Sequence, residues 1–160
     1  MRPLLALPLA LSLAACASDP ETPAVEPDPT SVEAAPAAAL GVDGAYARPA
    51  PAGGVSAVYM DLTNGTAQAD TLLGARTDAA GRVEVHRTEE DGEGLSGMVP
   101  VEGGLPIPAG ETVTLEPGGL HVMLLDLQRE LAVGDTLDVE VEFAGEGPRA
   151  LRVPVRAVGS

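Results

Sequence analysis

Apolar and polar residues alternate with a period of two along much of this chain. In residues 137–143, Leu, Val, Val and Phe alternate with Asp, Glu and Glu, and residues 151–157 and 112–115 follow the same rule. Such alternation is typical of strands that bury one face of a sheet, and it does not fit the 3.6-residue repeat of a helix. Residues 55–63 and 82–86 also alternate. We therefore expect an all-β fold in which His86 ends its strand.

Turn residues separate these segments at short intervals. Clusters rich in Gly, Pro, Asn and Asp fall at residues 64–65, 78–81, 102–104, 108–110, 117–119, 134–135 and 144–148. Many short strands with such turns and no amphipathic helix predict a Greek-key β-sandwich or a small barrel. The last turn is expected to join the final two strands and to set Arg152 and Arg156 opposite an acidic row. Pro154 places the final strand at a sheet edge.

The beginning of the chain has the features of an export signal. Arg2 precedes an apolar stretch at residues 4–13, which is too short to span a bilayer and has the length of a signal-peptide core. The stretch ends in Leu-Ala-Ala-Cys, which resembles a bacterial lipobox and implies that Cys16 receives a diacylglycerol. We expect residues 1–15 to be a lipoprotein signal peptide. The alternative is an ordinary secretory signal followed by a chance cysteine.

Between this signal and the alternating segments lies a region of different composition. Residues 16–39 are rich in Pro, Ala and acidic residues. Such a segment cannot bury enough apolar surface to fold, so we expect a disordered tether. The globular domain is predicted to span residues 40–160. We therefore expect a lipid-anchored protein of the periplasm or cell envelope. By analogy with the sorting of such lipoproteins, Ala17 and Ser18 lack the aspartate that retains a lipoprotein in the inner membrane, which favours the outer membrane.

Charge and cysteine content exclude several classes of function. The chain has 9 basic and 24 acidic residues, for a formal net charge of -15, so it offers no basic patch to bind nucleic acid. A single cysteine excludes an intramolecular disulfide, and with two histidines it also excludes zinc sites built from four cysteines or from two cysteines and two histidines. No Ser-His-Asp, Cys-His or paired-carboxylate pattern indicates an enzyme.

The few residues able to bind a soft metal share one pattern. His86 is followed by Met98 and then by His121 and Met123, which would project from the same face of a strand. Imidazole and thioether are neutral, and the soft thioether suits Cu(I) better than zinc, calcium or magnesium. The alternative is a core role, since His121 and Met123 share their parity with two leucines and could form a buried stripe. Met60 is expected to be a core residue.

The spacing and its surroundings resemble a known family. The matching segments are 47–49, 57–60, 63–64, 83–86, 101–104, 107–110 and 117–124, together with the His86, Met98, His121 and Met123 pattern. The chain is similar to the bacterial periplasmic copper chaperones called PCu(A)C. The resemblance implies a cupredoxin-like β-sandwich that binds one Cu(I) through these four side chains. It also implies delivery to the dinuclear copper centre in the copper-containing subunit of cytochrome c oxidase, often with Sco-type thiol proteins.

The chain departs from this family in two places. Arg87 occupies a position where many members carry a second methionine, and the acidic, glycine-rich residues 88–97 supply no further soft ligand. The chain also lacks a C-terminal tail rich in His and Met, so no second site for Cu(II) is expected. The prediction is a copper carrier that works by ligand exchange. A lipid-anchored interaction module without a metal role, and a metalloenzyme, are the alternatives.

Overall fold

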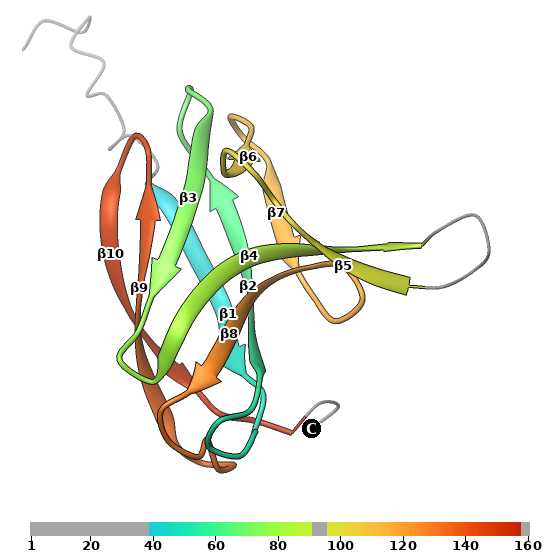
Figure 1. The fold of residues 1–160 in the computed structure, drawn as a ribbon. Coiled ribbons are helices and arrows are strands. Elements are labelled where there is room, and N and C mark those ends of the chain that lie inside the picture. The colour runs from blue at the N-terminus through green and yellow to red at the C-terminus, as the bar shows by residue number, and fades with distance from the viewer. Residues whose placement is uncertain (1–38, 91–95, 158–160) are drawn as a thin grey trace, which may run out of the picture. The chain divides into compact units, whose positions relative to one another are not determined.

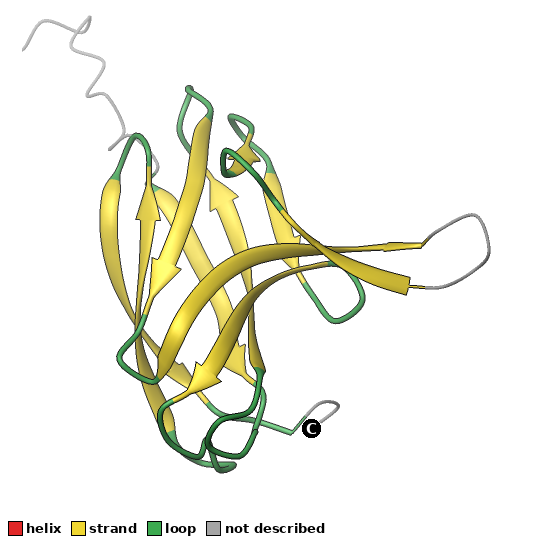
Figure 2. Ribbon diagram, viewed as in Figure 1, coloured by secondary structure: helices red, strands yellow, loops and turns green. Residues whose placement is uncertain are grey.

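The computed structural model describes residues 39–90 and 96–157, so the predicted signal peptide, Cys16 and nearly all of the predicted tether lie outside the described residues. The described residues form strands and no helix, which confirms the all-β prediction (Figure 2). In this part of the chain, no helix is long and apolar enough to cross a membrane.

Ten strands make up the described domain (Figure 1). They are β1 (Leu40–Ala47), β2 (Ser56–Asn64), β3 (Asp70–Arg76), β4 (Ala80–Glu90), β5 (Ser96–Pro100), β6 (Leu105–Ile107), β7 (Thr112–Leu115), β8 (Leu120–Leu127), β9 (Thr136–Phe143) and β10 (Gly147–Pro154). One sheet has the order β1-β2-β7-β8-β4-β5, with β2 also pairing with β8, and the other has the order β10-β9-β3-β6. Strands distant in sequence are therefore neighbours, as in a Greek-key sandwich.

The two sheets enclose one apolar core. Strand β9 alternates buried and exposed residues along its whole length, and the side chain of Phe143 is 1% exposed. The facing sheet contributes Val58, Met60 and Leu62 from β2, together with Val122 and Leu124 from β8. Burial of such side chains is the main force that holds the two layers together. Met60 is 2% exposed, so its predicted core role is confirmed.

The predicted final hairpin is present. Strands β9 and β10 pair antiparallel from Gly147 opposite Phe143, and β10 lies at the edge of its sheet. Arg152 lies opposite Asp138 as expected. The prediction for Arg156 was wrong, because β10 ends at Pro154 and the backbone N–H of Arg156 instead donates to the carbonyl of Ala47 in β1.

Strand β4 is longer than the alternation indicated. It continues through Glu90, so the prediction that His86 ends its strand was wrong. Pairing of β4 with β8 stops at Arg87, whereas pairing with β5 continues to Glu90. Residues 88–90 and strand β5 therefore form a two-stranded arm that projects beyond the other strands (Figure 1). We call this segment the β4–β5 arm.

Candidate metal centre

The two histidines face each other on neighbouring strands. His86 of β4 lies directly opposite His121 of β8 in the antiparallel register, and their ring centroids are 6.0 Å apart. Val85, which precedes His86, lies opposite Val122, which follows His121, and both valines belong to the core. Because side chains alternate between the faces of a sheet, both imidazoles lie on the face that points away from the core.

Both histidines are nevertheless buried. His86 is 8% exposed and His121 is 5% exposed. A row of rings explains this, since Tyr46 of β1 packs on Tyr59 of β2 at 5.2 Å and Tyr59 packs on His121 at 6.3 Å. With His86 beside His121, this row of rings crosses four strands on the outer face of the sheet. His86 thus lies off the core parity of β4 and is buried all the same.

Each imidazole has one nitrogen engaged in a hydrogen bond. Nδ1 of His121 lies 3.1 Å from the carbonyl oxygen of Gly119, to which it can only donate, so Nε2 keeps its lone pair. Nε2 of His86 lies 2.7 Å from Oε2 of Glu84. Nδ1 of His86 is buried and has no hydrogen-bond partner among the described residues. A buried polar atom without a partner is costly, and a bound ligand would satisfy it.

The turn before β8 fixes the position of His121. Gly118 has a φ of 83°, a left-handed conformation that residues with a Cβ rarely adopt. The turn brings the carbonyl of Gly119 under the imidazole, where it accepts the Nδ1 hydrogen bond. The sequence Pro-Gly-Gly before Leu120 therefore shapes the site as well as the turn between β7 and β8.

The methionines lie on the same face as the histidines. Met123 is two residues after His121 and lies opposite Ala57 of β2 and Glu84 of β4. Met98 of β5 lies opposite Thr88, which shares the parity of His86. Met98, His121 and Met123 line a cavity of about 280 Å³, whose wall also includes Tyr59 and Arg48. The structure thus gathers three of the predicted ligands around one cavity and places the fourth, His86, against His121.

The alternative prediction, a continuous buried stripe through His121 and Met123 on β8, does not match the structure. The core side of β8 carries Val122 and Leu124, and Met123 and Leu125 are only half-buried. Leu127 is buried although it shares the parity of Met123. The preceding Asp126 has a φ of 55°, and this left-handed residue interrupts the regular alternation.

The donor set suits a soft cation better than a hard one. Bonds between a metal and an imidazole nitrogen are about 2 Å long, so two rings that share one ion have centroids up to about 6 Å apart. The centroid distance of 6.0 Å between His86 and His121 is within this range. No group of three or more His, Cys, Asp or Glu able to hold a metal occurs within residues 39–90 and 96–157. The thioethers of Met98 and Met123 line the cavity beside His121 and are donors that favour Cu(I).

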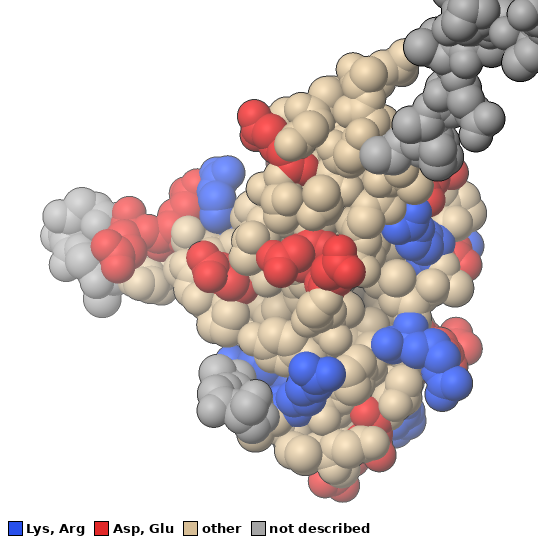
Figure 3. Space-filling model, turned by 180° about the vertical axis from the view of Figure 1, so that it is seen from behind, with Lys and Arg blue, Asp and Glu red and all other residues tan. Residues whose placement is uncertain are grey.

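Two residues beside the predicted ligands were not singled out from the sequence. Glu84 binds His86, and Tyr59 shields His121 and lines the cavity. Glu84 precedes His86 by two residues on the same parity, so the strand period alone could have identified it. In the acidic, glycine-rich segment 88–97, Glu89 and Glu90 belong to β4, and residues 91–95 lie outside the described residues. Acidic side chains gather toward the tip of the β4–β5 arm (Figure 3).

Comparison with other proteins identifies relatives of this chain. Residues 40–155 match the family described as "Putative lipoprotein LpqE-like". "Putative lipoprotein Lxx21020" of Leifsonia xyli subsp. xyli (strain CTCB07) is 32% identical over 103 residues, which are 64% of this chain and 61% of that protein. "Uncharacterized protein RP573" of Rickettsia prowazekii (strain Madrid E) is 30% identical over 100 residues, or 62% of this chain and 55% of that protein. The chain spans less than two thirds of both relatives.

Solved structures with the same fold include PCuAC domains. The copper-bound PCuAC domain from PmoF2 matches with a TM-score of 0.62 and 22% identity, covering 77% of this chain and 97% of that chain. The solution structure of apo-DR1885 from Deinococcus radiodurans has a TM-score of 0.57 and 32% identity, covering 90% and 97%. The CuI form of DR1885 also has a TM-score of 0.57 and 32% identity, covering 76% and 83%. The chain has the cupredoxin-like β-sandwich of PCuAC domains and belongs to the family of LpqE-like lipoproteins.

Proposed function

We propose that this protein is a copper carrier that binds one Cu(I) through His86, Met98, His121 and Met123. The main observation is that two buried imidazoles, each with one free nitrogen, and two thioethers lie on the same face of one sheet. Copper in the PmoF2 domain and Cu(I) in DR1885, which have the same fold, support the choice of metal. The role is transport and not catalysis.

Ligand exchange is the proposed mechanism of delivery. Met98 is 57% exposed and lies on the edge strand β5, whereas both histidines are less than 9% exposed. An incoming ligand of an acceptor protein can therefore replace the thioether of Met98 while the histidines still hold the ion. The four ligands are neutral, so the ion and its ligands together carry only the single positive charge of Cu(I).

We further propose that the protein acts in the periplasm or cell envelope as a lipoprotein. The Leu-Ala-Ala-Cys sequence at Cys16 supports this location, and so does the name of the family. Each buried methylene of a lipid chain contributes about 0.8 kcal/mol to membrane binding. By resemblance to the copper chaperones, the acceptor is the copper-containing subunit of cytochrome c oxidase, reached with Sco-type thiol proteins.

Competition with a chromophoric Cu(I) chelator tests the metal site. We expect wild-type protein to withdraw one Cu(I) from the chelator, and we expect the His121→Ala/Met123→Ala variant to withdraw far less. Met60→Leu is the matched control, because Met60 is a core methionine on the other side of the same sheet. If the double variant binds Cu(I) as tightly as the wild type, His121 and Met123 do not hold the ion and the proposed site fails. If the wild type withdraws no Cu(I), the alternative of a lipid-anchored interaction module without a metal role is favoured.

A deletion strain tests the delivery role. We expect oxidase activity to fall under copper limitation and to recover when copper is added. Normal oxidase activity in the copper-limited strain would exclude oxidase assembly and would leave copper buffering or tolerance as the use of the same site.

A further inference from the structure

We propose that Glu84 is a positioning residue that holds the imidazole of His86 so that Nδ1, and not Nε2, binds Cu(I). This inference rests on the proposed copper-carrier function. Oε2 of Glu84 lies 2.7 Å from Nε2 of His86, while Nδ1 is buried and has no partner among the described residues. An ionised carboxylate can only accept hydrogen bonds, so Nε2 carries the proton and Nδ1 keeps its lone pair.

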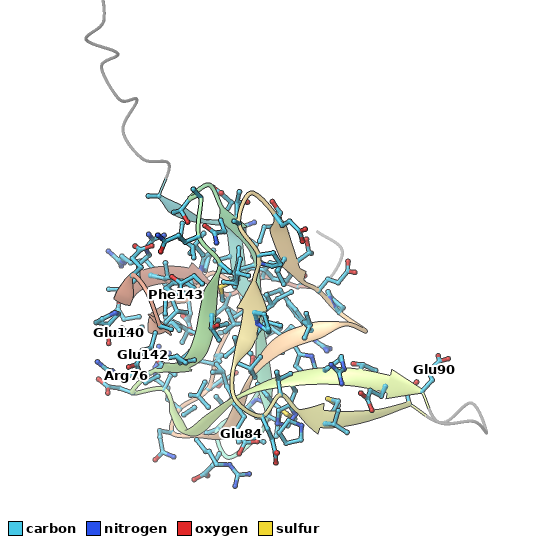
Figure 4. The ribbon with its side chains drawn as sticks, turned by 90° about the horizontal axis from the view of Figure 1, so that it is seen from above. Arg76, Glu84, Glu90, Glu140, Glu142 and Phe143 are labelled. Atoms are coloured by element: carbon cyan, nitrogen blue, oxygen red, sulfur yellow. The ribbon has the colours of Figure 1, made fainter. Side chains whose placement is uncertain are left out.

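The carboxylate of Glu84 is itself held in place. Its other oxygen, Oε1, forms an ion pair with Arg82, whose Nε lies 3.1 Å away. Arg82, Glu84 and His86 occupy every second position of β4 and so share one face of the strand. A single strand therefore supplies the guanidinium, the carboxylate and the imidazole. Figure 4 shows Glu84 on the part of β4 that belongs to the body of the domain, far from Glu90 at the end of the β4–β5 arm.

Burial makes this orientation effective. The side chain of His86 is 10% exposed and that of Glu84 is 32% exposed, so water has limited access to the hydrogen bond between them. Met123 lies directly opposite Glu84 on β8, and His121 lies directly opposite His86. The carboxylate therefore lies next to two of the proposed ligands. It is not one of the four side chains proposed to bind Cu(I). Hydrogen bonds of this kind fix the ring of a ligating histidine, and their loss typically lowers metal affinity about 10- to 100-fold.

Variants at Glu84 separate positioning from charge. Glu84→Ala removes the acceptor and the charge, whereas Glu84→Gln removes the charge but keeps an oxygen that can accept from Nε2. We expect Glu84→Ala to weaken Cu(I) binding by about 10- to 100-fold and Glu84→Gln to remain close to wild type. Glu89→Ala is the matched control, because Glu89 lies on the same strand and pairs with Arg87, a residue of the opposite parity to His86.

Proton NMR of the apo protein gives a second measurement that needs no copper. A slowly exchanging Nε2–H signal of His86 should be present in the wild type and in Glu84→Gln and absent from Glu84→Ala. In the Cu(I)-loaded wild type, which is diamagnetic, the ¹⁵N shift that moves on binding should belong to Nδ1.

Three outcomes would overturn the inference. Coordination through Nε2 would contradict the assigned nitrogen. Equal weakening by Glu84→Gln and Glu84→Ala would mean that charge and not orientation matters, and unchanged affinity in Glu84→Ala would mean that Glu84 does not act on the site. If wild-type protein binds no Cu(I) at all, the copper-carrier function fails instead, while the apo NMR spectra still report whether Glu84 orients His86.

Discussion

Val122 and Met123 are adjacent on β8 and should have opposite roles. The side chain of Val122 is 0% exposed and packs in the core, whereas Met123 is half-buried and lines the cavity on the other face. Substitution of Val122 by Ala should therefore reduce stability and leave copper binding intact. Substitution of Met123 by Leu should reduce copper binding and leave stability nearly intact.

The expected magnitudes follow from burial. Val122→Ala removes two buried carbon groups at about 0.8 kcal/mol each, and the remaining cavity adds to this, for a total of about 2 kcal/mol. For a domain of this size, that loss lowers the midpoint of thermal unfolding by roughly 8 °C. Leu has nearly the volume of Met, so Met123→Leu should cost well under about 1.5 kcal/mol, but it replaces a thioether with a group that cannot bind copper.

Two assays on the same preparations test this prediction. Urea denaturation measures the free energy of unfolding without copper, and chelator competition measures Cu(I) affinity at a temperature where both variants are folded. We expect Val122→Ala to change only the first quantity and Met123→Leu to change mainly the second. Comparable loss of copper affinity in both variants would refute the assignment of the two faces of β8, as would equal loss of stability.

Four other predictions follow from the sequence and structure. Cu(I) should quench tyrosine emission, because the chain has no Trp and Tyr59 lies 6.3 Å from His121; unchanged emission in a protein that binds copper would place the ion elsewhere. Met98→Leu should weaken Cu(I) binding without changing the urea midpoint, since Met98 is 57% exposed. Burial of Asp70 opposes its ionisation, but hydrogen bonds from the N–H groups of Gly145, Thr71 and Glu146 outweigh burial and hold its pKa below 3.8. The ionised Asp70 therefore stabilises the fold above its unfolded-state pKa, and this stability is lost as the pH falls through the lowered folded-state pKa. The Asp70→Ala variant should thus lose less stability on acidification than the wild type. The free energy of unfolding, measured over a range of acidic pH, tests this. Cys16→Ser should move the expressed protein from the detergent phase to the aqueous phase in a detergent partition assay.

The alternation of apolar and polar residues was sufficient for about half of the strands. Strands β2, β7 and β9 were predicted within a residue or so of their bounds. In β9 one face is buried and the other is largely exposed, whereas β2 also buries Ala57 and Tyr59 on its outer face. Strands β1, β3, β5 and β6 were not predicted. Strand β1 contains two glycines and an aspartate, β3 is interrupted by Gly74, β5 contains Gly97 and ends in Pro100, and β6 has only 3 residues. These strands are held by pairing with their neighbours more than by their own composition.

The sequence could predict which ligands share a face within one strand, but not which strands are neighbours. The spacing of His121 and Met123 was enough to place their side chains together, since the period of a strand is two. That His86 lies directly opposite His121 depends on the register of β4 with β8, two strands separated in sequence by three others. The fold topology determines which strands pair and in which register, and a local sequence pattern does not contain this information.

The uneven exposure of the four proposed ligands is consistent with carriage and less so with permanent storage. A site whose ligands were all buried would release copper only after a large conformational change. Here the two histidines are packed against the tyrosine row, while Met98 stands exposed on an edge strand that pairs with β4 alone. The rigid side of the site can retain Cu(I), and the exposed side can exchange its ligand with a partner. The same sheet therefore combines a buried core on one face with the accessible, proposed copper site on the other.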